Sequence, residues 1–255
     1  MASFLEDTPE LEDMNQYWYS PATIEALVAE IESSHVAGER IAFLSTPSIY
    51  FSLAKGGAAR SESWVFDYDR QWEGTCDHFK FYDYNDAEGS IADASLHGSF
   101  DVVVVDPPFI TRDVWSLYAD AVALLLNPEG SKRCILTTVG ENEAMLREIL
   151  GPEVGAPLRK TRFMPAMQNS KLPYQYSLYV NYVLEEASPL NTWNADVPLD
   201  FEEANAIRME DAIEGGEASG VAQMGKGERA LGGTKLSFEE LMEREMAREA
   251  AGGGG

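Results

Sequence analysis

Apolar runs typical of buried strands alternate with helical patterns along the first 183 residues, and this alternation constrains the fold more than any other feature. Strands are expected at 40–46, 63–69, 78–85, 100–106 and 132–139, and helices at 20–33, 48–55, 112–127 and 141–150. Strands joined through helices form a mostly parallel sheet that is covered on both faces. Two late strands, 158–167 and 176–183, have no helix between them and predict an antiparallel hairpin appended to that sheet. We therefore predict an α/β fold with seven strands.

The chain changes character near residue 184, where strand formers become few and Gly, Ala and Glu dominate. We expect an acidic N-terminal arm at 1–15, one folded domain at 16–184, and an acidic, mostly disordered tail at 185–255. Within the tail, Ser237 and Glu240 form a capping-box pattern ahead of an apolar face. This pattern predicts a short helix at 237–250, which is either transient or a docking helix.

The charge and the cysteine content of the chain limit which partners and which kinds of site are expected. The net charge of −24 produces a field that repels polyanions and attracts a basic partner, unless the acidity serves solubility alone. Two separated cysteines and three scattered histidines predict neither a disulfide framework nor a metal site. No apolar run approaches the length of a membrane span, and the acidic N-terminus has no apolar leader. We expect a cytoplasmic protein without membrane contact, and nothing demands more than a monomer.

Acidic residues follow two neighbouring strands of the expected sheet. Asp67 and Asp69 end the strand at 63–69, and Asp83 lies near the end of the strand at 78–85. Open α/β sheets bind ligands at the carboxyl ends of their strands. A carboxylate there suits the two hydroxyls of a ribose, and the acid on the next strand suits an adenine amino group. The alternative for each single residue is ordinary turn chemistry, in which Asp is common.

The first strand ends in LSTPS instead of a glycine-rich loop. The GxGxxG and GxxxxGK[ST] patterns are both absent, which disfavours a dinucleotide enzyme and a P-loop nucleotide hydrolase. A small serine and threonine turn still lets the backbone approach a ligand. The pattern of strands and helices alone is also compatible with a flavodoxin-like or dinucleotide-binding fold. The function must therefore be argued from the residues of the site.

The stretch DVVVVDPPF at 101–109 ends a buried strand abruptly. The strand delivers the carboxylate of Asp106, and the two prolines after it carry no N–H group. Carboxylate and carbonyl acceptors are therefore offered together, and Phe109 is expected to add a flat apolar wall. This combination suits an amine whose nitrogen lone pair must point at an electrophile. The alternative is a turn that simply ends the strand.

The motif DPPF resembles the [DNS]-PP-[YFW] motif of amino-group methyltransferases that use S-adenosylmethionine. Further stretches, NQYWYS, IAFLSTPS, FDYDRQW and FYDYND, resemble in order and spacing the eukaryotic lysine methyltransferases of translation elongation factor 1-alpha, first described as N6-adenine DNA methyltransferases. The resemblance covers roughly residues 14–184. It implies a class I methyltransferase sheet of the Rossmann-like type. The stretch NSKLPYQYS departs from the glycine-containing segment expected there, which affects the loop on the substrate side.

Carried over by position, the resemblance implies three groups of site residues. The target amine is held by Asp106, Pro107, Pro108 and Phe109. S-adenosylmethionine is bound by Ser45, Thr46, Pro47, Asp67, Asp69, Asp83, Tyr84 and Asp106. The pocket is closed from the N-terminal side by Tyr17, Trp18 and Tyr19, for which core packing is the alternative.

The resemblance implies transfer of a methyl group from a sulfonium to a lysine ε-nitrogen, with elongation factor 1-alpha, a basic protein, as partner. Asp106 is then expected to bind and orient the amine while solvent takes its proton. The nearest alternative is an N6-adenine methyltransferase acting on RNA or DNA, in which the same motif holds a flipped base. The acidic charge argues against a nucleic acid substrate. A non-catalytic scaffold that works through the tail is a second alternative, and the acids at the strand ends argue against it.

Overall fold

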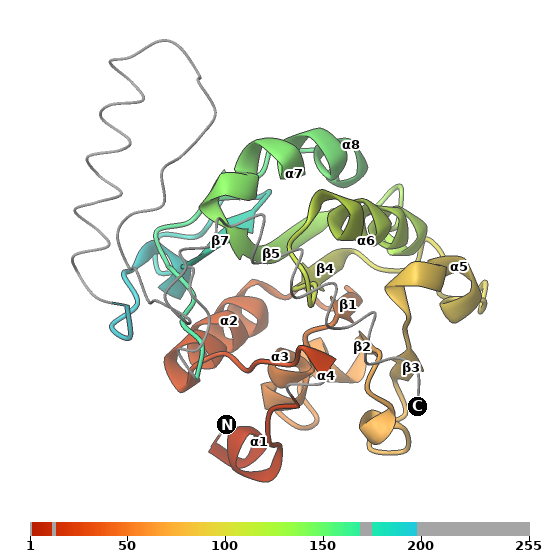
Figure 1. The fold of residues 1–255 in the computed structure, drawn as a ribbon, viewed down its shortest axis with the longest axis horizontal. Helices are drawn as coiled ribbons and strands as arrows, with labels where there is room; N and C mark the ends of the chain where they lie inside the picture. Colours follow the sequence, from red (N-terminus) through yellow and green to blue (C-terminus); the bar gives the residue numbers. More distant parts are fainter. Residues whose placement is uncertain (1, 12–13, 169–174, 198–255) are drawn as a thin grey trace, which may run out of the picture.

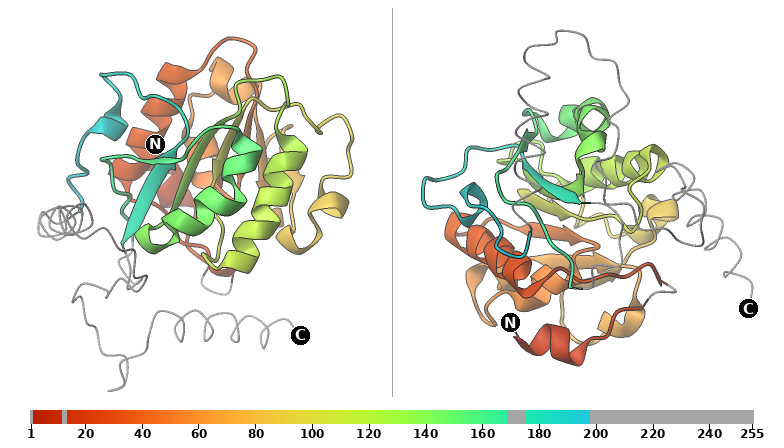
Figure 2. Two further views of the ribbon diagram at one scale, coloured as in Figure 1. Left: turned by 90° about the horizontal axis from the view of Figure 1, so that it is seen from above. Right: turned by 60° about the vertical axis from the view of Figure 1, so that its left-hand side comes forward.

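A seven-stranded sheet forms the centre of the molecule, and helices cover both of its faces (Figures 1 and 2). The computed structural model describes residues 2–11, 14–168 and 175–197. The strand order is β3–β2–β1–β4–β5–β7–β6, in which β7 is antiparallel to both of its neighbours and the remaining pairs are parallel. The strands are β1 (Ile41–Leu44), β2 (Trp64–Asp67), β3 (Phe79–Phe81), β4 (Val102–Val105), β5 (Arg133–Val139), β6 (Arg159–Lys160) and β7 (Tyr176–Val180). The predicted α/β class and the late antiparallel pair are confirmed.

The helices lie in two layers (Figure 1). One face of the sheet carries α5 (Ala87–Ser90), α6 (Arg112–Leu125), α7 (Glu143–Ile149) and α8 (Gly151–Val154). The opposite face carries α2 (Pro21–Ser34), α3 (Pro47–Ser52) and α4 (Ala58–Ser61). The N-terminal helix α1 (Ala2–Asp7) packs beside α3. Sequence patterns did not predict α1, α4, α5 or α8, each of which spans six residues or fewer and shows little periodicity.

Strand β4 shows why a central strand is apolar at every position. Val103 and Val105 join the core under α6, whereas Val102 and Val104 join the core under α2. Successive side chains of a strand point to opposite faces, so a strand buried on both sides has no polar alternation. The apolar run therefore ends where β4 ends, at the carboxyl ends of the parallel strands, and Asp106 follows directly.

Two helices begin where the sequence predicts. The side chain of Ser20 accepts a hydrogen bond from the Thr23 amide at 3.3 Å, and Pro21 occupies the first helical position of α2. Thr111 caps α6 in the same way through the Val114 amide, at 3.4 Å. Both caps satisfy amide groups that have no partner inside the helix.

The strand predicted at 158–167 is wrong in length, because β6 holds only Arg159–Lys160. Beyond it the chain leaves the sheet and runs towards the start of α2. There the carbonyl of Ala166 accepts from the Ser20 amide at 2.8 Å, and the Gln168 amide donates to the carbonyl of Trp18 at 2.8 Å. Pro165 lacks an N–H group and is poorly suited to a continued ladder.

The folded unit extends beyond residue 184, where the sequence analysis ended it. The carboxylate of Glu30 in α2 accepts hydrogen bonds from Ser188 at 2.5 Å and from Tyr182 at 3.0 Å. Leu190 and Val197 are buried, and Asn194 donates to the Met164 carbonyl at 2.9 Å. The helix predicted at 237–250 lies outside the described residues. Among the residues described, no helix is both long and apolar enough to cross a membrane.

Candidate functional site

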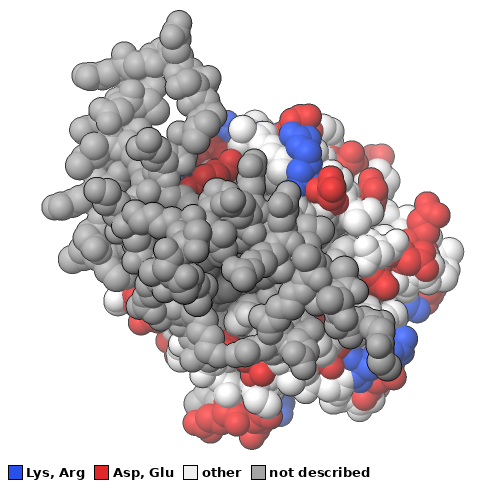
Figure 3. All heavy atoms as spheres, viewed as in Figure 1, with Lys and Arg blue, Asp and Glu red and all other residues white. Residues whose placement is uncertain are grey.

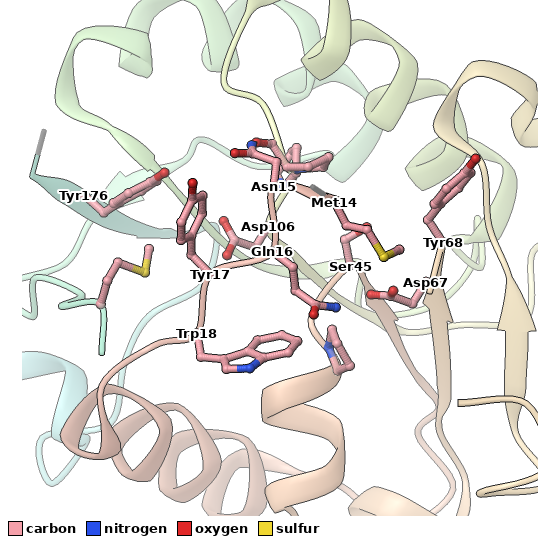
Figure 4. A pocket seen from close by; sticks show the side chains of 14 residues that line it. Met14, Asn15, Gln16, Tyr17, Trp18, Ser45, Asp67, Tyr68, Asp106 and Tyr176 are labelled. Carbon is pink, nitrogen blue, oxygen red and sulfur yellow. The ribbon is translucent and has the colours of Figure 1, made fainter. Parts of the chain in front are cut away.

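A cavity lies at the carboxyl ends of β1, β2 and β4, beneath the segment that precedes α2 (Figure 4). The parallel strands end at this edge, so their last residues and the following loops converge. Of the predicted site residues, eight line the cavity: Tyr17, Trp18, Ser45, Pro47, Asp67, Asp106, Pro107 and Pro108. The structure therefore places the expected amine motif and the expected ribose carboxylate in one site.

Asp106 lines the cavity and accepts hydrogen bonds on both of its carboxylate oxygens. Its Oδ1 accepts a hydrogen bond from the Thr137 hydroxyl at 2.6 Å, and its Oδ2 accepts one from the Tyr19 hydroxyl at 2.5 Å. The two hydroxyl oxygens are themselves 2.5 Å apart. Burial raises the pKa of the Asp106 carboxyl to about 6, and the bonds from Thr137 and Tyr19 limit the rise. At neutral pH the group is therefore mostly an anion that still accepts hydrogen bonds.

Asp67 lies at the opposite end of the same cavity (Figure 4). Its Oδ1 accepts a hydrogen bond from the Asp69 amide at 2.8 Å. Burial raises the pKa of the Asp67 carboxyl to about 7; the Asp69 amide lowers it, and the Asp69 charge adds to the rise. Within the described residues Oδ2 has no protein partner, so this carboxylate can accept hydrogen bonds from the hydroxyl groups of a ligand.

The loop after β1 is shaped to pass close to a ligand. Ser45 has a φ of 55°, in the left-handed region, and its hydroxyl lies 2.6 Å from the Tyr118 hydroxyl. Its amide donates to the carbonyl of Phe66 at 2.8 Å. Pro47 begins α3 and lines the cavity, whereas Thr46 is buried and donates to the Val104 carbonyl at 3.4 Å.

Six predicted site residues do not line the cavity: Tyr19, Thr46, Asp69, Asp83, Tyr84 and Phe109. The carboxylate of Asp69 accepts the Gln71 amide at 2.9 Å, and that of Asp83 accepts the Asn85 amide at 2.9 Å. Tyr84 packs against Tyr118 with ring centroids 5.9 Å apart. Phe109 is 3% exposed and belongs to the core under α6. The structure thus places Phe109 in the core and not in the lining of the cavity, so the prediction that Phe109 adds an apolar wall to the site is wrong.

The segment before α2 forms the roof of the cavity. Asn15 has a φ of 50°, and its side-chain amide donates to the Pro108 carbonyl. Gln16 lies between Asp106 and Asp67 in Figure 4 and donates from Nε2 to the Asp69 carboxylate at 3.2 Å. Trp18 is held by a bond from its indole N–H to the Thr8 carbonyl at 3.0 Å. The roof is therefore tied to both ends of the cavity.

Sequence reasoning missed several lining residues and one partner of Asp106. The missed lining residues are Met14, Asn15, Gln16, Tyr68, Met167 and Tyr176. Tyr68 lies between Asp67 and Asp69 in the sequence, so its place next to two predicted site residues indicates a position at the cavity. Thr137 lies within the buried strand β5, where a threonine looks like any strand-forming residue.

A family model described as "Probable N6-adenine methyltransferase" matches residues 10–184. A protein-lysine N-methyltransferase of Dictyostelium discoideum is 34% identical over 125 residues, which span 49% of this chain and 58% of that protein. The EEF1A lysine methyltransferase 1 of Danio rerio is 32% identical over 66% of this chain and 96% of its own length. The chicken protein of the same name is 31% identical over 66% of this chain and 74% of its own length.

Among solved structures, a branched-chain polyamine synthase from Thermus thermophilus, in complex with N4-aminopropylspermidine and 5'-methylthioadenosine, has a similar fold. The TM-score is 0.53 at 13% identity, and the match covers 73% of this chain and 64% of that one. At this identity the likeness concerns the fold alone. It agrees with the predicted class I sheet.

Proposed function

Because this chain belongs to the probable N6-adenine methyltransferase family, we propose that it is a protein-lysine N-methyltransferase that uses S-adenosylmethionine and acts on elongation factor 1-alpha. The observation that carries the proposal is the single cavity that joins Asp67 to Asp106, Pro107 and Pro108. One end suits a nucleoside, and the other suits an amine. The three relatives described above are named for lysine methylation, and two of these three for EEF1A.

The cofactor end fits S-adenosylmethionine on the evidence of an unsatisfied carboxylate. Asp67 is 7% exposed, and among the described residues its carboxylate accepts one hydrogen bond, at Oδ1. The two hydroxyls of a ribose supply the donors that this anion lacks. Ser45 and Pro47, which follow β1 in the sequence, line the same cavity. When bound, S-adenosylmethionine supplies an electrophilic methyl group on a sulfonium.

The amine end is built to orient a nitrogen. Asp106 presents carboxylate lone pairs beside the carbonyl of Pro107, and no proline N–H competes for them. A free lysine has a pKa of about 10.4, so its ammonium must lose a proton before the nitrogen can attack. An anionic Asp106 favours the ammonium form, which makes it a poor base for this step. Its role is therefore to bind and align the amine, while solvent takes the proton.

The charge of the chain favours a protein over a nucleic acid. The net charge is −24, and acidic side chains gather over α1 at the lower edge of the face in Figure 3. A basic protein is attracted by such a field, whereas phosphates are repelled. The family description names adenine, so N6-adenine methylation remains the second candidate. A monomer in the cytosol remains the expectation from the sequence.

The test is methyl transfer from labelled S-adenosylmethionine to elongation factor 1-alpha and, separately, to total RNA. We expect label on a lysine of the factor. In Asp106→Asn the amide donates where the carboxylate accepts, so turnover is expected to fall at least 100-fold. Binding of S-adenosylmethionine, measured by calorimetry, is expected to change less than threefold because Asp67 is intact.

The matched control is Asp120→Asn, which removes an exposed aspartate of α6. This variant is expected to keep wild-type turnover. Label on RNA without label on the factor would replace the lysine proposal with the adenine one. Full turnover in Asp106→Asn would contradict the role given to the motif.

A further inference from the structure

The Asp106 carboxylate is held from two sides by hydroxyls that come from distant parts of the chain. Tyr19 precedes α2, and Thr137 belongs to β5. Each hydroxyl donates to a different carboxylate oxygen, at 2.5 and 2.6 Å. Tyr19 is 3% exposed and Thr137 is likewise 3% exposed, so water does not compete for these bonds.

The hydrogens of this triangle can be arranged in more than one way, because either hydroxyl can donate across the Tyr19–Thr137 contact. The two hydroxyls own two protons, and three short contacts connect the three groups. An ionised carboxylate only accepts, and its charge favours the arrangement in which each hydroxyl donates to Asp106. One lone pair on each oxygen is then taken, and the others remain for a ligand in the cavity.

We propose that Tyr19 and Thr137 are positioning residues that clamp the Asp106 carboxylate and aim its remaining lone pairs at the substrate amine, an inference that rests on the proposed amine methyltransfer. The clamp has two consequences. It holds the carboxylate plane still, so the amine meets acceptors already in place. It also disperses the negative charge, which weakens the preference of Asp106 for an ammonium over a neutral amine.

The clamp also sets the pH at which Asp106 loses its charge. Bonds from Thr137 and Tyr19 oppose the effect of burial on this carboxyl, so removing either hydroxyl moves its pKa upward. No lysine, arginine or histidine lines the cavity among the described residues. The other titratable groups that line it are Asp67, Tyr17, Tyr68 and Tyr176.

The test is the pH dependence of kcat/KM in the full chain, with S-adenosylmethionine and elongation factor 1-alpha. For the wild type, log kcat/KM is expected to rise with slope two below about pH 6 and slope one above it, because both Asp106 and the lysine must lose a proton. Tyr19→Phe and Thr137→Val are each expected to move this break upward by about one pH unit. Thr137→Ser keeps the hydroxyl and is expected to restore the wild-type break.

Matched controls remove similar groups elsewhere. Tyr82→Phe deletes a buried tyrosine hydroxyl that has no partner within the described residues, and Thr138→Val changes the next residue of β5, whose hydroxyl accepts from Asn142 at 3.0 Å. Neither variant is expected to move the break. An unchanged break in both Tyr19→Phe and Thr137→Val would overturn the clamp.

A second readout separates this inference from the proposed function. The protein is labelled with 13C at aspartate carboxyls, and the Asp106 resonance is identified by its loss in Asp106→Asn. Its titration in the ligand-free protein is expected to shift upward by about one pH unit in each clamp variant. A shifted titration without methyl transfer to any substrate would support the clamp and contradict the proposed function. An unshifted titration would contradict the clamp alone.

Discussion

At the scale of single residues, Asp67 shows how a binding site opposes stability. The carboxylate is buried, and its pKa lies near 7, well above the value of about 4 expected in an unfolded chain. The folded protein therefore binds the proton more tightly, so its contribution to stability is present at low pH and is lost as the pH rises through about 7. Above pH 7 the ligand-free protein retains a mostly buried charge whose carboxylate accepts one hydrogen bond from the described residues.

We predict that Asp67→Asn raises the Tm of the ligand-free protein at pH 8 and that the gain shrinks towards pH 5. One pKa unit corresponds to about 1.4 kcal/mol, so a gain of 1–3 kcal/mol, roughly, is expected at pH 8. The same change is expected to weaken S-adenosylmethionine binding at least tenfold, because a ribose hydroxyl loses its anionic acceptor. Scanning calorimetry and binding titrations measure the two effects. Asp77→Asn, at an exposed position, is the control.

A lower Tm for Asp67→Asn at pH 8 would show that the carboxylate is satisfied in the ligand-free protein. Unchanged affinity for S-adenosylmethionine would remove Asp67 from the cofactor site. The lower Tm would contradict the electrostatic account of Asp67, whereas the unchanged affinity would contradict its role in cofactor binding.

At the scale of elements, the segment after β7 completes the layer that contains α2. Glu30 is 3% exposed and accepts from Tyr182 and Ser188, so a chain that ends at residue 184 loses one of the two partners of this carboxylate. Leu190 is fully buried against the same layer. We predict that a protein truncated after residue 184 has a Tm at least 5 °C below that of one truncated after 197.

Thermal unfolding of the two truncated chains, followed by circular dichroism, measures this difference. Glu30→Gln in the 1–184 chain is expected to recover part of the loss, because a neutral amide costs less to bury than a carboxylate. Equal Tm values would place the end of the folded unit at residue 184, as the sequence suggested.

At the scale of the whole molecule, a net charge of −24 is expected to act on the encounter with a basic substrate. Salt screens such a field, since the Debye length falls from about 10 Å at 0.1 M to about 3 Å at 1 M. We predict that raising NaCl from 50 to 300 mM increases the KM for elongation factor 1-alpha about tenfold. The kcat is expected to change less than twofold.

The control is a lysine-containing peptide of the factor with a net charge near zero, whose KM is expected to respond little to salt. A salt-independent KM for the whole factor would mean that contacts at the site, and not the general field, determine its recognition. A KM that falls with salt would contradict an attractive field.

The sequence by itself determined the features that depend on a few neighbouring residues. The start of α2 was predicted because Ser20 caps the amides just after it, and the start of α6 was predicted from its amphipathic pattern, whereas the Thr111 cap is seen only in the structure. The apolar run of β4 predicted a doubly buried strand, and the Asp-Pro-Pro sequence after it placed acceptors at the sheet edge. The strand predicted at 158–167 had a weaker local pattern. Its later residues leave the sheet and pair with the segment before α2 instead.

Only the tertiary structure decided how the site is assembled. Tyr19 and Thr137 lie 87 and 31 residues from Asp106, and no local pattern links them. Packing between segments that are distant in the sequence also buries Phe109 in the core and places Gln16 at the cavity. Capping and periodicity act over a turn of helix or a few strand residues, whereas a hydroxyl reaches a carboxylate only after the sheet has ordered its strands.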